Sequence, residues 1–325
     1  MAIQNPEPPP FNETKDDGME DFSYIHFTVV ACCIFLLCVI GMLGNGITFW
    51  FLCFRIPKNK CIVYIVNLNI ADFMYLLFNA ILSLLHINHF VGFRPEFSGE
   101  DEIIICLEIF YDCAYQAGML FLLAISIERC LSVLYPIWYH CRRPKYQSEF
   151  VCLTLWLLAT FVSLLENLIC SPEIFPVGPA KCIGVQTMSF ILYVCISLPL
   201  MLLSSCILLI KVRKMSKNCR PPKLYIIILI TVFVFLIATI PVKFMWLMFY
   251  LKHLPIGFHS RGFFYASIFC TVFSSSINPY IYFLVGRQKN QRLLSSIHNS
   301  MCFMWRRKGC LINQVIQQML IRSQL

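Results

Sequence analysis

Charged residues are scarce in this sequence. Asp, Glu, Lys and Arg make up 13% of the 325 residues, whereas 58% are hydrophobic. A soluble domain carries about 25% charged residues, so the composition argues against a surface that faces water on all sides. Internal repeats, low-complexity blocks and signs of a second domain are also absent. We therefore expect one membrane domain over residues 27–285, with an N-terminal tail (1–26) and a C-terminal segment (286–325).

The motifs of metal sites, nucleotide sites and common hydrolases are missing as well. No Cys or His cluster has zinc-ligand spacing, and no glycine-rich phosphate loop, paired catalytic carboxylates or Gly-x-Ser-x-Gly turn occurs. The 18 cysteines lie mostly inside apolar runs, where cysteine behaves as a small buried hydrophobe. A disulfide scaffold would instead need a small secreted domain. The sequence therefore predicts no metal, no catalytic residue and no enzyme activity.

The first 21 residues lack the positively charged start and the short apolar core of a cleaved signal peptide. They are polar and acidic instead, so the first long apolar segment is expected to act as an uncleaved insertion signal. Asn12-Glu13-Thr14 in this tail forms an N-glycosylation sequon. A glycan is therefore predicted on Asn12.

Long apolar segments are what the sequence has in abundance. A helix needs roughly 20 apolar residues to cross the hydrocarbon core, and helices are favoured there because each satisfies its own backbone hydrogen bonds. Seven windows qualify: residues 27–54, 62–85, 106–134, 150–169, 183–210, 224–251 and 263–285. The sequence therefore predicts an all-α membrane protein built as a seven-transmembrane helix bundle.

Basic residues set the expected orientation of this bundle. If the N-terminus is outside the cell, the inner segments hold 19 Lys and Arg residues and the outer segments hold five. Cytoplasmic loops are the ones enriched in Lys and Arg, so we expect the N-terminus outside and the C-terminus inside, in the plasma membrane. The net charge of +9 then reflects topology, and no nucleic-acid partner is expected.

A mixed basic and apolar pattern follows the seventh window. Arg287, Lys289 and Arg292 alternate with leucines and an isoleucine, which predicts a short amphipathic eighth helix at the lipid interface. Cys302 and Cys310 beyond it are candidates for palmitoylation. Membrane lipids are therefore expected partners of this segment.

Short polar motifs occur once per apolar window, in a fixed order. They are Gly44-Asn45-Gly46, Leu68-Asn69-Ile70-Ala71-Asp72, Glu128-Arg129-Cys130, Trp156, Pro199, Pro241 and Asn278-Pro279-Tyr280-Ile281-Tyr282. In this order the chain resembles the rhodopsin-like family of G-protein-coupled receptors across all seven windows. The resemblance implies a receptor that signals to a heterotrimeric G protein by a two-state helix shift. A secondary transporter is the alternative, but transporters usually show internal repeats and matching broken helices, which this sequence lacks.

A narrower resemblance is to the Mas-related receptors. It rests on residues 128–139 (ERCLSVLYPIWY), on residues 143–148 (RPKYQS) and on Lys223-Leu224-Tyr225. It implies an extracellular peptide or small-molecule ligand and a G protein of the Gq or Gi type.

An acidic residue at membrane depth marks a predicted polar core. Asp72 has no basic neighbour in its own window, and such a residue is a functional candidate by default. Its expected partners are Asn45, Ser274, Ser275 and Asn278. The resemblance implies a water-filled core linked to an allosteric sodium ion, and no other cofactor is expected. The alternative is a structural, hydrogen-bonded carboxylate.

The third window ends in an arginine motif. Arg129 lies 17 residues beyond Asp112, or roughly 25 Å along a helix, which places it at the cytoplasmic end with Glu128 as its adjacent counter-charge. A membrane-edge ion pair without a switching role is the alternative. The resemblance assigns activation and G-protein coupling to a larger set: Glu128, Arg129, Ile137, Asn278, Pro279 and Tyr282.

The chain departs from the family pattern at several positions. Thr239 replaces the tryptophan before the proline of the sixth window, and Ile207 replaces a tyrosine of the fifth. No carboxylate marks the inner end of the sixth window, so we expect an inactive state that is locked less tightly. The family's usual disulfide position holds Ile104. The Mas-related resemblance implies instead a disulfide between Cys170 and Cys182, which the oxidising outside permits.

The expected ligand site lies at the outer ends of the third, fourth and sixth windows. Glu108 and Asp112 are four residues apart and share a helix face, and Glu166 and Lys243 lie in the neighbouring windows. Such an acidic vestibule with one deeper cation suits a basic or zwitterionic ligand. The alternative is that Lys243 neutralises Asp112 or Glu166 internally. Aromatic surface is expected from Tyr111, Tyr115 and Trp246.

Overall fold

The computed structural model describes residues 17–54, 60–91, 100–144, 146–170, 179–215 and 258–286, with nine further positions between 233 and 251. Most of the sixth apolar window lies outside this description. Several predicted features also lie outside the described residues: Asn12, Trp246, the side chain of Tyr282, the amphipathic eighth helix, Cys302 and Cys310.

The described residues form helices and contain no strand. The elements are α1 (Asp17–Phe54), α2 (Lys60–Val91), α3 (Glu100–Leu134), the short π-helix η2 (Trp138–Arg142), α4 (Gln147–Cys170), α5 (Pro179–Phe190), the π-helix η3 (Ile191–Ser197), α6 (Leu198–Met215) and α8 (Phe258–Gly286). Because α5, η3 and α6 follow one another without a gap, they form one long helix.

Five stretches of described helix are long and apolar enough to cross a membrane: Thr28–Phe54, Ile62–Leu85, Glu102–Leu134, Gln147–Cys170 and Ala180–Lys211. They agree with the first five predicted windows to within four residues at each end, so these predicted spans are confirmed. The seventh window lies in α8. In the sixth, the N–H of Leu251 donates to the carbonyl of Leu247 at 2.9 Å, which is the spacing of an α-helix.

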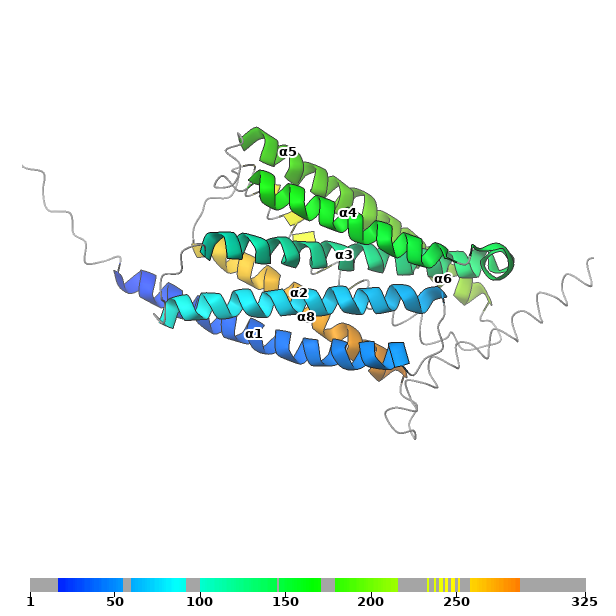
Figure 1. Cartoon of the computed structure of the whole chain (residues 1–325), viewed down its shortest axis with the longest axis horizontal. Coiled ribbons are helices and arrows are strands. Elements are labelled where there is room, and N and C mark those ends of the chain that lie inside the picture. The colour runs from blue at the N-terminus through cyan, green and yellow to red at the C-terminus, as the bar shows by residue number, and fades with distance from the viewer. Residues whose placement is uncertain are drawn as a thin grey trace, which may run out of the picture.

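The third helix runs through the middle of the bundle. It contacts α2, α4, η3 and α6, whereas α1 packs on α2 and α8 (Figure 1). Within the most apolar stretch of each span, 56% of α3 is buried inside the protein, against 28–44% in the other four spans. The central position therefore explains how α3 can carry charged residues, because many of its side chains face protein instead of lipid.

The outward faces of the helices are apolar. On α4, Phe150, Leu153, Leu157 and Phe161 are exposed and recur every three or four residues, so they line one side of the helix. A continuous apolar stripe of this kind is unusual on a soluble monomer. In a bilayer it faces lipid tails, which agrees with the scarcity of charge in the sequence.

Small residues let α1 and α8 approach closely. A Cβ atom added at Gly41 would lie 2.8 Å from Leu76 Cδ1 and would collide with Ser276. The Ser276 hydroxyl donates to the carbonyl of Leu37 at 3.2 Å, and the Asn45 amide donates to the carbonyl of Ser275 at 3.2 Å. Close backbone approach at small residues is the usual way that membrane helices gain packing contacts.

The fifth span contains a wide turn just before Pro199. The Leu198 N–H donates to the carbonyl of Tyr193, five residues back, and the Ser197 hydroxyl donates to the carbonyl of Leu192 at 2.8 Å. Single π turns of this kind occur often at functional sites. Here the turn carries Tyr193, whose side chain is buried in the bundle.

Candidate functional site

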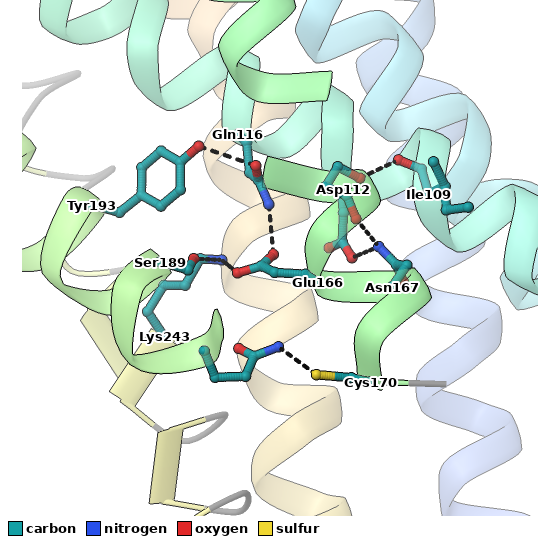
Figure 2. Close-up of polar contacts among 11 residues, drawn as sticks. Ile109, Asp112, Gln116, Glu166, Asn167, Cys170, Ser189, Tyr193 and Lys243 are labelled. Carbon is teal, nitrogen blue, oxygen red and sulfur yellow. Dashed lines mark hydrogen bonds and ion pairs between the residues drawn. The ribbon is translucent and has the colours of Figure 1, made fainter. Parts of the chain in front are cut away.

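A buried ion pair joins α4 to the sixth apolar window. The ammonium of Lys243 lies 3.5 Å from Glu166 Oε1 (Figure 2). Both residues are almost fully enclosed, with 7% and 5% of their surfaces exposed. Of the two alternatives drawn from the sequence for Lys243, the geometry matches an internal contact with Glu166.

Gln116 on α3 bonds the second oxygen of the Glu166 carboxylate. The Gln116 amide donates to Glu166 Oε2 at 2.6 Å, and the Tyr193 hydroxyl donates to the Gln116 carbonyl oxygen at 3.0 Å (Figure 2). The network therefore links the third, fourth, fifth and sixth spans. The π turn of η3 supplies Tyr193, so the irregular helix and the charged cluster belong to one arrangement.

Aromatic rings and a hydroxyl surround the Lys243 ammonium. Its Nζ lies 5.2 Å from the ring centre of Tyr193 and 5.8 Å from that of Tyr115. These distances are within the range of cation–π attraction. The ammonium also donates to the Ser189 hydroxyl at 3.4 Å.

A second carboxylate lies on α3, across from Glu166 in the close-up view (Figure 2). Asp112 Oδ2 accepts a hydrogen bond from the Asn167 amide at 2.8 Å. The same amide donates to the Ser163 carbonyl at 3.0 Å, and the Ser163 hydroxyl donates to the carbonyl of Ile109 at 2.7 Å. These bonds tie α3 to α4 beside the ion pair.

The predicted ligand residues are brought together only in part. Asp112, Tyr115, Glu166 and Lys243 gather at this end of the bundle, whereas Glu108 is exposed on α3. The Tyr111 ring lies tilted against Tyr75 with ring centres 5.2 Å apart, and Tyr115 lies 5.6 Å from the same ring. The aromatic pair therefore faces α2 as well as the charged cluster.

The sequence did not single out four residues of this site: Gln116, Asn167, Ser189 and Tyr193. Gln116 could have been found from its spacing, since it lies four residues after Asp112 and therefore on the same helix face. Asn167 is the neighbour of Glu166. No comparable signal marks Ser189 and Tyr193, because their orientation depends on a helix that widens in η3.

A disulfide closes this end of the bundle. Cys170, the last residue of α4, is bonded to Cys182 on α5, with Cα atoms 4.9 Å apart. This pairing confirms the one implied by the Mas-related resemblance. The Gln186 amide lies 3.9 Å from the sulfur of Cys170. The bond fixes α4 against α5 next to the Glu166 network.

A separate polar group lies deeper between α1, α2 and α8. The Asn278 amide donates to Asp72 Oδ2 at 2.8 Å. Asn45 reaches α8 through its bond to the Ser275 carbonyl, and Ser274 and Asp72 are both buried. Asn278 is one of the four partners that the sequence suggested for Asp72.

The opposite end of α3 holds a buried salt bridge. Both carboxylate oxygens of Glu128 are bonded by the Arg143 guanidinium, with Nη2 2.7 Å from Oε1. The Tyr64 hydroxyl donates to the same oxygen at 3.0 Å, and Arg143 donates to the Ser148 hydroxyl at 2.9 Å. The sequence had suggested Glu128 as the counter-charge of Arg129, and it did not suggest Arg143 as a partner of Glu128.

The surroundings of Arg143 favour its charged form. Burial by itself lowers the pKa of the guanidinium, but the hydrogen bond and the negative charge of Glu128 more than offset it, so the pKa lies above its usual value. The guanidinium also stacks over the Tyr139 ring, 4.8 Å from its centre. Arg143 therefore anchors η2 to the end of α3.

Comparison with known proteins identifies the family. The profile of the 7 transmembrane receptor (rhodopsin family) matches residues 44–282. Proto-oncogene Mas of Homo sapiens is 38% identical over 287 residues, covering 88% of this chain and 84% of that protein. Its counterpart in Mus musculus is 40% identical over 261 residues, covering 79% and 78%. Mas-related G-protein coupled receptor member D of Rattus norvegicus is 36% identical over 287 residues, covering 87% and 88%.

These matches confirm the receptor predicted from the ordered motifs. They give no support to a secondary transporter or to an enzyme, and with the apolar spans they indicate a multi-pass protein of the plasma membrane. The chain belongs to the rhodopsin family of G-protein-coupled receptors, within the group of Mas and Mas-related receptors.

Proposed function

We propose that this receptor has its N-terminus outside the cell and binds an extracellular peptide or small molecule at the Glu166–Lys243 network. Signalling then passes to a Gq- or Gi-type heterotrimeric G protein at the opposite end of α3. The observation that carries the proposal is the buried network itself. It connects four spans through charged and hydrogen-bonded side chains, so a ligand that perturbs it acts on all four.

The disulfide and the basic loops support the orientation. The Cys170–Cys182 bond needs an oxidising compartment, which the outside provides. The excess of Lys and Arg falls on the segments that this orientation places in the cytoplasm. A ligand arriving from outside would therefore meet the disulfide end of the bundle first.

The Arg143 end offers a surface for the G protein. Ile137 is 50% exposed beside η2, and Tyr135 and Tyr146 are exposed on either side of it. Apolar and aromatic side chains that a protein leaves exposed are typical contact residues for a partner. With Arg129 at the same end of α3, these residues form the proposed coupling face.

The Asp72–Asn278 contact lies on the route between the two ends. We propose that it belongs to the two-state element that a ligand biases, since a membrane-buried carboxylate joined to another helix is costly to keep without a function. The role of a sodium ion at Asp72 remains a prediction of the family resemblance.

A substitution at Arg129 tests the proposal. Arg129→Ala should abolish ligand-stimulated G-protein activation while surface expression persists, and the exposed Arg142→Ala serves as the control. Agonists would come from a panel of acidic, basic and zwitterionic peptides, read out by calcium and cyclic nucleotides. Ligand affinity should fall when a guanine nucleotide uncouples the G protein. Undiminished signalling from Arg129→Ala, or affinity that ignores guanine nucleotides, contradicts the proposal.

A further inference from the structure

Tyr75 of α2 lies in a buried group of hydroxyls and aromatic rings. Its hydroxyl and that of Thr271 on α8 are 2.6 Å apart and share a hydrogen bond, and only 1% of the surface of Tyr75 is exposed. The ring centres of Tyr111 and Tyr115 on α3 lie 5.2 and 5.6 Å from that of Tyr75. From α2, Tyr75 therefore contacts both α3 and α8.

This group adjoins the charged cluster of Glu166, Asp112 and Lys243. The ring centre of Tyr115 is 5.8 Å from the Lys243 ammonium. Lys243 itself interacts with the charges of Glu166 and Asp112. A displacement of Lys243 therefore alters the surroundings of Tyr115, whose ring packs on Tyr75.

The Asp72–Asn278 contact lies on the other side of Tyr75. Asp72 precedes Tyr75 by three residues, so the two share a face of α2. Asn278 follows Thr271 by seven residues, or about two turns of α8. Two buried hydrogen bonds at different depths therefore join α2 to α8, one at Tyr75 and one at Asp72.

Both hydroxyls of the Tyr75–Thr271 bond have a second partner. The Thr271 hydroxyl also lies 2.9 Å from the Ile268 carbonyl oxygen in its own helix. The Tyr75 hydroxyl also interacts with that of Tyr111 on α3. Asn79 reaches the Tyr75 side chain as well, but it lies on α2 and moves with it. A buried hydroxyl without a partner is costly, so these second partners lower the cost of separating α8 from α2.

We propose that Tyr75 is the positioning residue that links the charged cluster to the Asp72–Asn278 contact. Its hydroxyl bonds Thr271 in one arrangement of the bundle and Tyr111 in the other, so α8 is held in the first and released in the second. The proposal rests on the function proposed above. It identifies a two-state element whose equilibrium both ends of the receptor can bias.

Substitutions that remove one hydroxyl at a time test the proposal. Thr271→Val leaves Tyr75 with its partner on α3, whereas Tyr111→Phe leaves it with its partner on α8. The two variants should change ligand-free nucleotide exchange on purified Gq and Gi in opposite directions from the parent. The expected difference between them is about threefold or more, as for the loss of one hydrogen bond. A change in the same direction, as from a loss of stability, overturns the proposal.

A Tyr75→Phe background shows whether the two effects depend on the same hydroxyl. This variant keeps the ring but forms neither bond, so Thr271→Val and Tyr111→Phe should no longer differ when added to it. A difference that persists in this background overturns the proposal. Thr271→Ser retains the hydroxyl and should behave like the parent. The control is Thr154→Val on α4, where the exposed hydroxyl bonds the carbonyl of Phe150 in its own helix at 2.9 Å.

The distance between α2 and α8 provides a readout that needs no G protein. Spin labels would be attached through Leu84→Cys and Phe263→Cys, which are exposed positions on α2 and α8. The free exposed cysteines of the receptor would be replaced by alanine. Thr271→Val and Tyr111→Phe should shift the distribution of label distances in opposite directions. Unchanged distributions overturn the proposal, whatever the exchange assay gives.

The two readouts separate this proposal from the receptor function. Opposite distance shifts without nucleotide exchange on Gq or Gi, in the parent and in every variant, would contradict the proposed coupling alone. Exchange that Arg129→Ala abolishes, together with equal distances in all variants, would contradict only the role of Tyr75.

Discussion

Arg143 bonds both carboxylate oxygens of Glu128 at the end of α3. Removing the arginine would leave a buried carboxylate without its counter-ion, which typically costs about 3–5 kcal/mol. We expect Arg143→Ala to lower the Tm of the purified receptor. Arg143→Lys should restore only part of the loss, because an ammonium cannot form the two-pronged contact of a guanidinium.

The adjacent Arg142 provides a matched control, since it is exposed. Arg142→Ala should leave the Tm close to that of the parent receptor. Equal losses from the two alanine variants would show that the salt bridge does not anchor η2.

The positions of the spans along the chain could be predicted because they depend on the local composition of the sequence. The length of each apolar run and its bounding charges locate a helix, and the first five predicted windows agree with the described spans. The central position of α3 was not predicted; the structure shows it, and it accounts for the charged residues of this span, which require protein neighbours.

The partners of individual charged residues were harder to predict. The Asp72–Asn278 contact was anticipated because both residues carry family motifs. For Glu128 the sequence suggested only its neighbour Arg129 and did not suggest Arg143, which follows η2 and bonds Glu128. Pairing of this kind depends on the path of an irregular segment, which apolar periodicity does not encode.

The Asp72–Asn278 hydrogen bond predicts the outcome of a residue swap. Asp72→Asn and Asn278→Asp each change the charge of a buried site, and each should reduce G-protein activation. The double variant Asp72→Asn/Asn278→Asp restores one carboxylate and one amide across the same 2.8 Å contact. Activation should therefore recover in part, measured per receptor at the cell surface. A double variant as impaired as the sum of the singles would mean that this contact does not contribute.

The packing of α1 on α8 predicts that Gly41 tolerates no larger residue. A Cβ at this position meets Ser276 and Leu76, and overpacking typically costs about 1–3 kcal/mol. Gly41→Val should reduce surface expression and Tm. Gly46→Val is the control, because the nearest atom to a Cβ there is 4.0 Å away. Similar expression of the two variants would contradict the close packing.

The disulfide predicts a local effect on the extracellular end. Cys182→Ser frees α5 from α4 and should lower the Tm, since native disulfides typically contribute about 2–4 kcal/mol. Cys106→Ser is a suitable control, because Cys106 is a free and exposed cysteine of α3. Peptide mapping under non-reducing conditions checks the bond directly. Free thiols at both Cys170 and Cys182 in surface-expressed receptor would contradict it.

The strongest energetic prediction concerns the coupling between Glu166 and Lys243 without any ligand. Glu166→Gln leaves a buried ammonium, and Lys243→Gln leaves a buried carboxylate, so each single variant should unfold at a lower temperature than the parent. The double variant removes both charges of the pair and leaves Asp112 on its hydrogen bond from Asn167. The side-chain carbonyl introduced at position 166 would still accept the Gln116 amide in place of the carboxylate. The loss in the double variant should therefore be smaller than the sum of the single losses, with a coupling of about 0.5–3 kcal/mol.

Strict additivity in this cycle would mean that the two charges do not stabilise each other, although they are 3.5 Å apart. Such a result is physically possible only if water reaches the pair, because screening by water weakens the attraction between opposite charges. Salt separates the two cases. A coupling that persists from low to high ionic strength indicates an enclosed pair, whereas one that disappears indicates a pair open to solvent. Both residues are nearly inaccessible, so we expect the coupling to persist.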